Sequence, residues 1–175
     1  MIAYLDIETN AVKADWGMVV AVGLLKGEEP EVRFADTPEE ERKVLEWLRD
    51  ELQNCSKLVT WYGPGFDIPF LLARAALHQI DLSKLIEIPM LDLCEWSRGH
   101  LLLSSYKLES VARFFGIQRA LEFHGGDVSA LFKLATRGDY EARRLIVDHC
   151  KEDLLLLKRV YERLKPQIDR PKQRG

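Results

Sequence analysis

Two acidic side chains near the N-terminus have the spacing of a metal site. Asp6 and Glu8 stand two residues apart at the end of an apolar run that begins at Met1. Alternate side chains of an extended strand point to the same face, about 7 Å apart. Carboxylates this close repel each other unless a cation lies between them, and hard divalent cations prefer oxygen ligands. The alternative is a strand end at which both acids are simply hydrated.

Asp67, His149 and Asp153 are further candidates for chemistry. Asp67 follows a Gly-Pro-Gly break and precedes an expected helix with proline in its first turn, so it could also be a helix N-cap. His149 and Asp153 are four residues apart, which places them on one helical face, although an ordinary surface pair has the same spacing. Asp148 and Glu152 are rotated away by roughly 100° per residue, and we expect them to be hydrated.

The elements that would position these residues begin with three strands. Residues 1–5 form an apolar run, and residues 17–25 are rich in β-branched side chains. Residues 31–35 alternate between polar and apolar as an edge strand does. A Gly-Glu-Glu-Pro turn at residues 27–30 joins the second strand to the third. Short connections of this kind predict an antiparallel meander.

The middle of the chain alternates between helix and strand. Thr37 precedes a proline and is followed by Glu40 at the capping-box position, which predicts a helix start. A strand, a helix and a short fifth strand are then expected over residues 57–62, 68–78 and 86–93. Leu101, Leu102 and Leu103 could form either an exposed contact loop or a packed one.

The C-terminal half is predicted to be helical. Helices are expected over residues 107–115, 128–135 and 140–164, with glycines at 116 and 138 ending the first two. The whole pattern predicts a mixed, five-stranded α/β sheet flanked by helices. We expect one domain over residues 1–166 and a basic, flexible tail over residues 167–175.

Composition restricts the class of protein further. The chain has 175 residues, of which 47% are hydrophobic and 30% are charged, as in an ordinary globular domain. No apolar run reaches the roughly 20 residues of a membrane span, and the N-terminus lacks a signal peptide, so a cytoplasmic location is expected. The three cysteines form no C-x-x-C pair, which excludes a zinc ribbon and predicts buried, reduced thiols. The net charge of −3 does not exclude nucleic acid, because two divalent cations at the acids would reverse its sign.

Taken together and in order, these residues resemble the three motifs of the DEDD superfamily of 3′–5′ exonucleases, which includes the proofreading domains of DNA polymerases. Y-L-D-I-E-T at residues 4–9 resembles the first motif, T-W-Y-G-P-G-F-D-I-P-F-L at residues 60–71 the second, and H-C-K-E-D at residues 149–153 the third. Residues 92–112 also resemble the segment before the third motif in family B polymerase exonucleases. Residues 138–156 are similar to stand-alone prokaryotic exonucleases. The resemblance extends from Met1 to about Leu164 and implies a ribonuclease H-like fold.

Two positions depart from the family pattern. The tyrosine subclass has its tyrosine four residues before the last aspartate, and the histidine subclass has its histidine five residues before. His149 stands at the tyrosine spacing, so this chain is a hybrid of the two. Tyr62 stands where the family usually has asparagine.

The resemblance implies hydrolysis of phosphodiesters with two divalent cations, Mg²⁺ or Mn²⁺. Asp6 would bridge both cations, Glu8 and Asp153 would complete one site, and Asp67 would hold the second. His149 would orient the attacking water and could accept its proton, since an ordinary imidazole pKa of about 6.5 suits a base at neutral pH.

The implied substrate is single-stranded nucleic acid with a free 3′ end, with DNA favoured over RNA. Thr9, Tyr62, Phe66 and Lys107 are the expected substrate contacts, and Arg74 and Arg113 are further candidates for phosphate. The chain would act alone, as a homo-oligomer or as a subunit of a repair complex, without a membrane.

Three alternatives remain open. An endonuclease that cuts RNA in hybrids or branched DNA would share the metal chemistry and differ in how it grips the substrate. A catalytically inactive nucleic-acid-binding module would keep the fold without the reaction, and a purely structural α/β protein would use neither.

Overall fold

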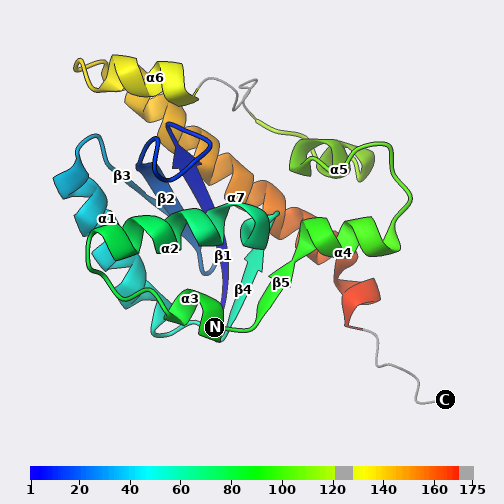
Figure 1. Ribbon diagram of the computed structural model, residues 1–175. Coiled ribbons are helices and arrows are strands. Elements are labelled where there is room, and N and C mark those ends of the chain that lie inside the picture. Colours follow the sequence, from blue (N-terminus) through cyan, green and yellow to red (C-terminus); the bar gives the residue numbers. More distant parts are fainter. Residues whose placement is uncertain (121–127, 170–175) are drawn as a thin grey trace.

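A five-stranded sheet forms the centre of the protein, in the strand order β3-β2-β1-β4-β5 (Figure 1). The computed structural model describes residues 1–120 and 128–169. The strands are β1 (Ile2–Thr9), β2 (Val19–Leu25), β3 (Pro30–Phe34), β4 (Lys57–Thr60) and β5 (Met90–Asp92). β1, β2 and β3 pair antiparallel, whereas β4 is parallel to β1 and β5 is parallel to β4. The predicted mixed sheet with three antiparallel strands first is confirmed.

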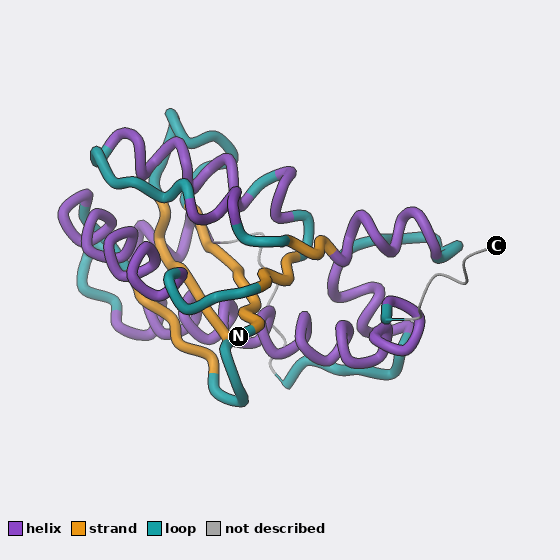
Figure 2. Tube along the Cα trace, turned by 90° about the horizontal axis from the view of Figure 1, so that it is seen from below, coloured by secondary structure: helices purple, strands orange, loops and turns teal. Residues whose placement is uncertain are grey.

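Helices cover both faces of this sheet. They are α1 (Pro38–Leu52), α2 (Asp67–Leu77), α3 (Lys84–Glu87), α4 (Leu93–His100), α5 (Leu108–Phe114), α6 (Val128–Ala135) and α7 (Tyr140–Ile168), with a 3₁₀ turn η1 (Gly63–Gly65) before α2. The long helix α7 packs on β1, β2 and β3 on one face, and α1 and α2 lie on the other. Figure 2, seen from below, shows the strands between these helices.

The alternation of side chains along β1 separates the core from the candidate site. Leu5 and Ile7 pack into the core cluster that includes the apolar faces of α1 and α2. Tyr4 packs into the other cluster, beneath α7. Because side chains alternate between the faces of a strand, Asp6 and Glu8 lie on the side of Tyr4 and face α7. The prediction that both acids share one face is therefore confirmed.

The region around β5 differs from the sequence-based prediction. The fifth strand was expected over residues 86–93, but residues 84–87 form the short helix α3 and only Met90–Asp92 pair with β4. The helix α4 was not predicted at all. It begins where it does because the Asp92 carboxylate caps it, accepting a hydrogen bond from the Glu95 amide at 2.8 Å. The same carboxylate accepts hydrogen bonds from Thr60 Oγ1 and the Gly63 amide, each at 2.8 Å, which ties the end of β5 to the turn after β4.

The C-terminal helices follow the prediction closely. α6 has the predicted bounds, and Gly116 and Gly138 adopt positive φ angles of 74° and 90°, as expected of residues that end helices. α7 continues to Ile168, four residues beyond the expected end, although Pro166 lies inside it. The expected flexible tail falls mostly on residues 170–175, which lie outside the described residues.

Three smaller predictions can also be compared with the structure. Leu102 is fully exposed, whereas Leu101 and Leu103 pack against the core under α7, so the loop is both exposed and packed. Cys55, Cys94 and Cys150 are buried free thiols, as expected. Over residues 1–120 and 128–169, no helix has the length and apolar character needed to cross a bilayer.

A buried ionic network joins α1 and α2 to the segment after β1. Glu41 of α1 is fully buried and accepts hydrogen bonds from Arg74 of α2 at 2.7 and 2.9 Å and from the Val19 amide at 2.8 Å. Its Oε2 also lies 2.7 Å from His78 Nε2. Burial by itself would raise the pKa of Glu41, but the hydrogen bonds from Arg74 and His78 outweigh it and lower that pKa.

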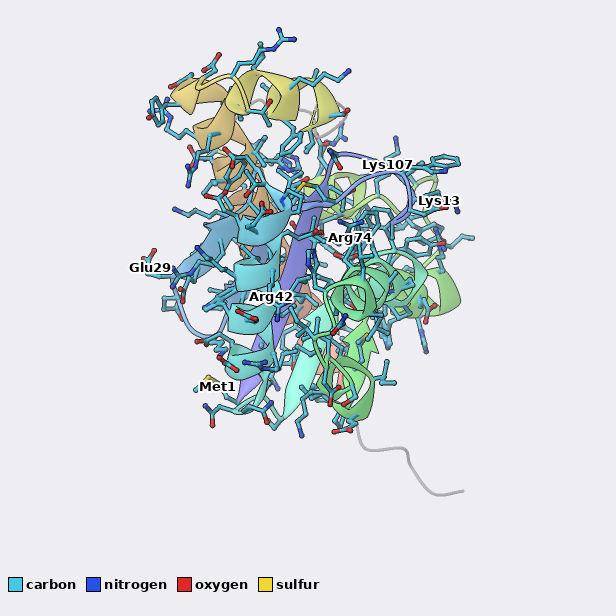
Figure 3. All side chains as sticks on the ribbon, turned by 60° about the vertical axis from the view of Figure 1, so that its left-hand side comes forward. Met1, Lys13, Glu29, Arg42, Arg74 and Lys107 are labelled. Carbon is cyan, nitrogen blue, oxygen red and sulfur yellow. The ribbon has the colours of Figure 1, made fainter. Side chains whose placement is uncertain are left out.

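Arg74, expected as a possible phosphate contact, is instead engaged in this network. Its remaining donor, Nη1, binds the Ala14 carbonyl oxygen at 3.0 Å, so the guanidinium holds the 10–18 loop against α2. Figure 3 shows Arg74 between α1 and α2. Its charge is compensated inside the protein and is not presented to a substrate.

We expect Glu41→Gln to lower the free energy of unfolding by about 3 to 5 kcal/mol, because it leaves the Arg74 charge buried without its partner. Urea denaturation at neutral pH measures this change. Glu39→Gln, at an exposed position of the same helical turn, is the matched control and should stay within about 0.5 kcal/mol of the unaltered protein.

Because the pKa of Glu41 is lowered, its contribution is present above the unfolded-state pKa and is lost as the pH falls through the folded-state value. The difference between Glu41→Gln and the unaltered protein should therefore shrink on acidification. Equal stability of the two proteins at neutral pH would contradict a structural role for this network.

Candidate functional site

Three elements distant in sequence bring the candidate residues together. Asp6 and Glu8 come from β1, Asp67 from the start of α2, and His149 and Asp153 from α7, which packs across β1. Figure 1 shows α7 crossing behind the sheet, of which β1 is the central strand. All five candidate residues from the sequence interact with at least one other member of the group.

The closest group consists of Glu8, His149 and Asp153. Glu8 Oε1 and His149 Nδ1 are hydrogen-bonded across 2.5 Å, and Asp153 Oδ2 lies 3.6 Å from the same nitrogen. One potential ligand atom from each residue lies within 4.8 Å of the others, a separation that a single metal ion can bridge. Glu8 and His149 are buried, and the Asp153 side chain is 16% exposed.

Asp6 lies beside this group with an unpaired oxygen. Its Oδ2 is buried and has no hydrogen-bond partner among the described residues. Burial first, and then the Asp153 and Glu8 carboxylates, raise the pKa of Asp6 well above its ordinary value. A buried carboxylate oxygen without a donor costs free energy, and a cation would satisfy it.

Asp67 was predicted as a possible N-cap, and that role is wrong. Phe66 occupies the N-cap position, Asp67 is the first residue of α2, and no side chain caps the helix. The backbone of Phe66 (φ −143°, ψ −65°) places the chain so that the Asp67 carboxylate points back towards β1, where it accepts a hydrogen bond from the Ile7 amide. Burial raises the pKa of Asp67 to about 7, the amide hydrogen bonds partly offset this, and the Glu8 charge adds to it.

His149 and Glu8 shift each other's pKa. Burial lowers the pKa of His149, but the hydrogen bond and the charge of Glu8 outweigh burial, so that the pKa lies above its ordinary value of 6.5. Burial raises the pKa of Glu8 as well, and His149 offsets part of that rise. Glu8 therefore favours the protonated form of His149, and His149 favours the ionised form of Glu8.

α7 can approach the acids because of one glycine. Gly23 of β2 pairs with Asp6 of β1, and a Cβ atom added to it would lie 2.6 Å from Leu154 Cδ1 and 2.7 Å from Cys150 Sγ. Real side chains do not approach so closely, so a larger residue would require the Leu154 and Cys150 side chains to rearrange or α7 to move away from the sheet. The sequence analysis treated Gly23 as part of a strand and did not identify this contact.

Arg119 and Glu152 are site residues that the sequence analysis missed. Arg119 Nη2 donates to Asp153 Oδ1, and its Nη1 lies 3.9 Å from Glu152 Oε2. Glu152 was expected to be hydrated, but its side chain is only 15% exposed and accepts a hydrogen bond from the Ala120 amide at 3.1 Å. The prediction for Glu152 is wrong because the segment after α5 covers its side of α7. Nothing in the spacing of residues 119 and 153 could have revealed this pairing.

A pocket of about 450 Å³ opens next to Glu8. Residues 7–12, Phe66 and the start of α6 at Val128 and Ser129 line it. Thr9 and Phe66, two of the expected substrate contacts, therefore lie in the pocket wall. Thr9 Oγ1 donates to the Ala11 carbonyl at 2.7 Å, and the Met18 amide donates to Asn10 Oδ1 at 2.7 Å, which shapes the loop that forms this wall.

Tyr62 and Lys107, the other expected substrate contacts, lie outside this pocket. Tyr62 is 44% exposed and has a backbone φ angle of 60°, which residues other than glycine rarely adopt. Its ring lies directly over Gly65, where an added Cβ would approach ring atoms to within 2.6 Å. Arg98 stacks at 5.3 Å from the ring centroid. Lys107 is exposed just before α5 (Figure 3), and within the described residues no hydrogen bond or ion pair connects it to the acids.

Comparison with solved structures agrees with this fold. The chain is similar to a family B DNA polymerase from the hyperthermophilic archaeon Pyrobaculum calidifontis, with a TM-score of 0.72 and 20% sequence identity. The match covers 94% of this chain and 24% of the polymerase, so the chain spans about a quarter of the polymerase's length. At this level of identity the similarity shows a shared fold.

Comparison of sequences identifies the family. The chain is 27% identical over 173 residues to an uncharacterized protein of Methanocaldococcus jannaschii, covering 95% of both chains. The family model described as the RNase_H superfamily matches residues 3–165. That range contains all five candidate residues, which come from β1, α2 and α7. The ribonuclease H-like fold expected from the three motifs is confirmed. The chain therefore belongs to the RNase_H superfamily.

Proposed function

We propose that this protein is a metal-dependent 3′–5′ exonuclease that hydrolyses single-stranded nucleic acid, with DNA favoured over RNA. The observation that carries the proposal is the convergence of four carboxylates and a histidine from β1, α2 and α7, with a buried Asp6 oxygen that lacks a partner. Membership of the RNase_H superfamily and the polymerase-like fold support a nuclease.

We propose that the site residues hold two divalent cations. Asp6, Glu8 and Asp153 would hold one, and Asp6 with Asp67 would hold the second. The donors are carboxylate oxygens, which favours Mg²⁺ or Mn²⁺ over Zn²⁺. When bound, such cations supply an activated water and stabilise the leaving 3′ oxygen. The raised pKa of Asp6 agrees with this role, because an ionised carboxylate in this position requires a compensating charge.

His149 is proposed to accept the proton of the attacking water. It lies within the acidic group, 3.6 Å from Asp153 and hydrogen-bonded to Glu8, so it is close to any water that these carboxylates would orient. The hydrogen bond between Glu8 and Nδ1 fixes the orientation of the imidazole ring beside the acids, as a group that accepts a proton there requires.

The pocket beside Glu8 is proposed to hold the terminal nucleotide of the substrate. Phe66 offers an aromatic ring and Thr9 a hydroxyl in its wall, and both lie next to the acids. A pocket of about 450 Å³ with one wall formed by a loop suits a single unpaired nucleotide better than a duplex end.

The first test is degradation of a 5′-labelled single-stranded DNA oligonucleotide. With Mg²⁺ or Mn²⁺ we expect a ladder that shortens from the 3′ end, and no cleavage in chelator. Asp6→Asn should reduce the rate by more than about 100-fold, the scale expected when one electrostatic stabiliser of the transition state is removed. Asp148→Asn, one turn from the site residue Glu152 and adjacent to His149 on α7, removes the same charge and should cleave normally.

Two further substrates separate this proposal from its alternatives. Cleavage of circular single-stranded DNA would show that no free end is needed and would favour an endonuclease. Tight DNA binding without cleavage of DNA, RNA or branched substrates would favour an inactive binding module.

We also expect Asp6→Asn to stabilise the cation-free protein at neutral pH by about 1 to 3 kcal/mol, because it removes a buried charge without a partner. The raised pKa of Asp6 means that its ionisation destabilises the fold increasingly as pH rises above the unfolded-state value. Urea denaturation in chelator measures the gain, and added Mn²⁺ should stabilise the unaltered protein more than the variant. A variant less stable than the unaltered protein in chelator would contradict this account of Asp6.

The activity should depend on pH through His149. A base accepts a proton only in its neutral form, so the raised pKa of His149 places the rising limb of the rate above pH 6.5. His149→Ala should lower the rate about 100-fold or more and remove that limb, the usual scale for one acid–base group. The measurement is kcat/KM between acidic and alkaline pH, with Asp148→Asn as the control. An unchanged profile in His149→Ala would refute the role of base.

A further inference from the structure

A second pocket is lined by two arginines, one of which, Arg119, contacts Asp153. It has a volume of about 210 Å³ and lies between α5 and α7. Its lining residues are Glu109, Arg113, Ile117, Gln118, Arg119 and Leu156. Arg119 is paired with Asp153 and Glu152, and Glu109 also lines the pocket, so Arg113 is the arginine here that no ion pair among the described residues engages.

Arg119 connects this pocket directly to the acidic site. Its Nη2 donates to Asp153 Oδ1, while Asp153 Oδ2 faces His149 at 3.6 Å. Asp153 thus uses one oxygen for Arg119 and directs the other towards the group proposed to bind cations. A ligand that occupied the cation site and extended past Asp153 would reach Arg119 next.

Two nitrogens of the Arg119 guanidinium have hydrogen-bond donors that no described residue satisfies. The Arg119 side chain is 13% exposed, and its buried Nε and Nη1 atoms have no hydrogen-bond partner among the described residues, although Nη1 lies 3.9 Å from Glu152 Oε2. Unmet donors in a largely buried guanidinium are costly, and an anionic oxygen would satisfy them. Arg113 is exposed and, over the described part of the chain, forms no ion pair with an acid.

We propose that Arg113 and Arg119 bind a backbone phosphate of single-stranded nucleic acid, adjacent to the bond that is cleaved. Planar guanidinium groups match the oxygens of a phosphate and bind them through paired hydrogen bonds. The inference rests on the proposed nuclease function and extends it, because it gives the strand a contact on the α5 side of the acids. The pocket beside Glu8 would hold the terminal nucleotide, and the two arginines would hold the phosphate of its neighbour.

The test is the salt dependence of DNA binding. Fluorescence anisotropy of a short oligodeoxythymidylate is followed over a range of NaCl concentrations, with Ca²⁺ replacing Mg²⁺ so that binding is read without cleavage. Each phosphate contact on a single strand contributes about 0.7 to the slope of log affinity against log salt. Arg113→Gln and Arg119→Gln should each lower that slope by about 0.7 and weaken binding by about 3- to 30-fold at low salt.

Matched variants separate a phosphate contact from a general effect of charge or folding. Arg144→Gln removes one charge at an exposed position of α7 and should leave the slope unchanged. Arg113→Lys should keep the slope, because it keeps the charge, and bind more weakly than the unaltered protein, because it loses the paired hydrogen bonds. Mn²⁺ affinity by calorimetry should change less than about threefold in Arg113→Gln, which shows that the cation site is intact.

An unchanged slope in both glutamine variants, or an equal decrease in Arg144→Gln, would overturn the inference. A large loss of Mn²⁺ affinity in Arg119→Gln would also overturn it for Arg119, because that residue would then act by positioning Asp153. If the unaltered protein neither binds nor cleaves nucleic acid, the proposed function itself fails, and this inference fails with it. If the protein binds and cleaves DNA but the salt slope is unchanged in Arg113→Gln and Arg119→Gln, the phosphate contact is refuted and the nuclease proposal is retained.

Discussion

The close approach of α7 to the sheet at Gly23 is the constraint on which the site depends. Asp6 and Gly23 are paired across β1 and β2, and Leu154 and Cys150 of α7 occupy the space where a side chain would stand. This contact sets the depth at which His149 and Asp153 sit above the strand. Since interiors are packed as densely as crystals, a larger residue at position 23 would require the buried Leu154 and Cys150 side chains to rearrange or α7 to move away from β1.

Bringing these acids together costs stability, and the rest of the fold has to offset that cost. The pKa values of Asp6, Glu8 and Asp67 are all raised, chiefly by burial, so the site is unfavourable to ionise without a cation. His149 and Arg119 supply the internal compensation, the first towards Glu8 and the second towards Asp153. Elsewhere in the fold, Glu41 accepts hydrogen bonds from Arg74, and Asp92 accepts them from Thr60 and the Gly63 amide, which hold the surrounding loops in place.

Local signals in the sequence were sufficient for most of the elements. The Thr37 cap gave the start of α1, with Thr37 Oγ1 accepting from the Glu40 amide, and glycines 116 and 138 ended their helices at positive φ. Glu40, however, accepts a hydrogen bond from the Asp36 amide and not from Thr37, one residue away from the expected capping box. α4 was not predicted because it begins at the Asp92 carboxylate, which accepts hydrogen bonds from Thr60 and the Gly63 amide as well as from the Glu95 amide. Hydrogen bonds between residues distant in sequence produce no periodic pattern of apolar residues.

The amino-acid sequence by itself determined the order of the five strands and of α1, α2, α5, α6 and α7, but not α3 or α4. It also determined the shared face of Asp6 and Glu8 and the shared helical face of His149 and Asp153, because each depends on spacing along one element. Tertiary structure alone decided that Asp67 turns towards β1 and does not cap α2, that Arg74 is buried against Glu41, and that Arg119 reaches Asp153. These pairings join residues from separate elements, and their geometry is set by how closely helices pack on the sheet. The depth of α7 over Gly23 is therefore what converts five separately ordinary residues into one candidate site.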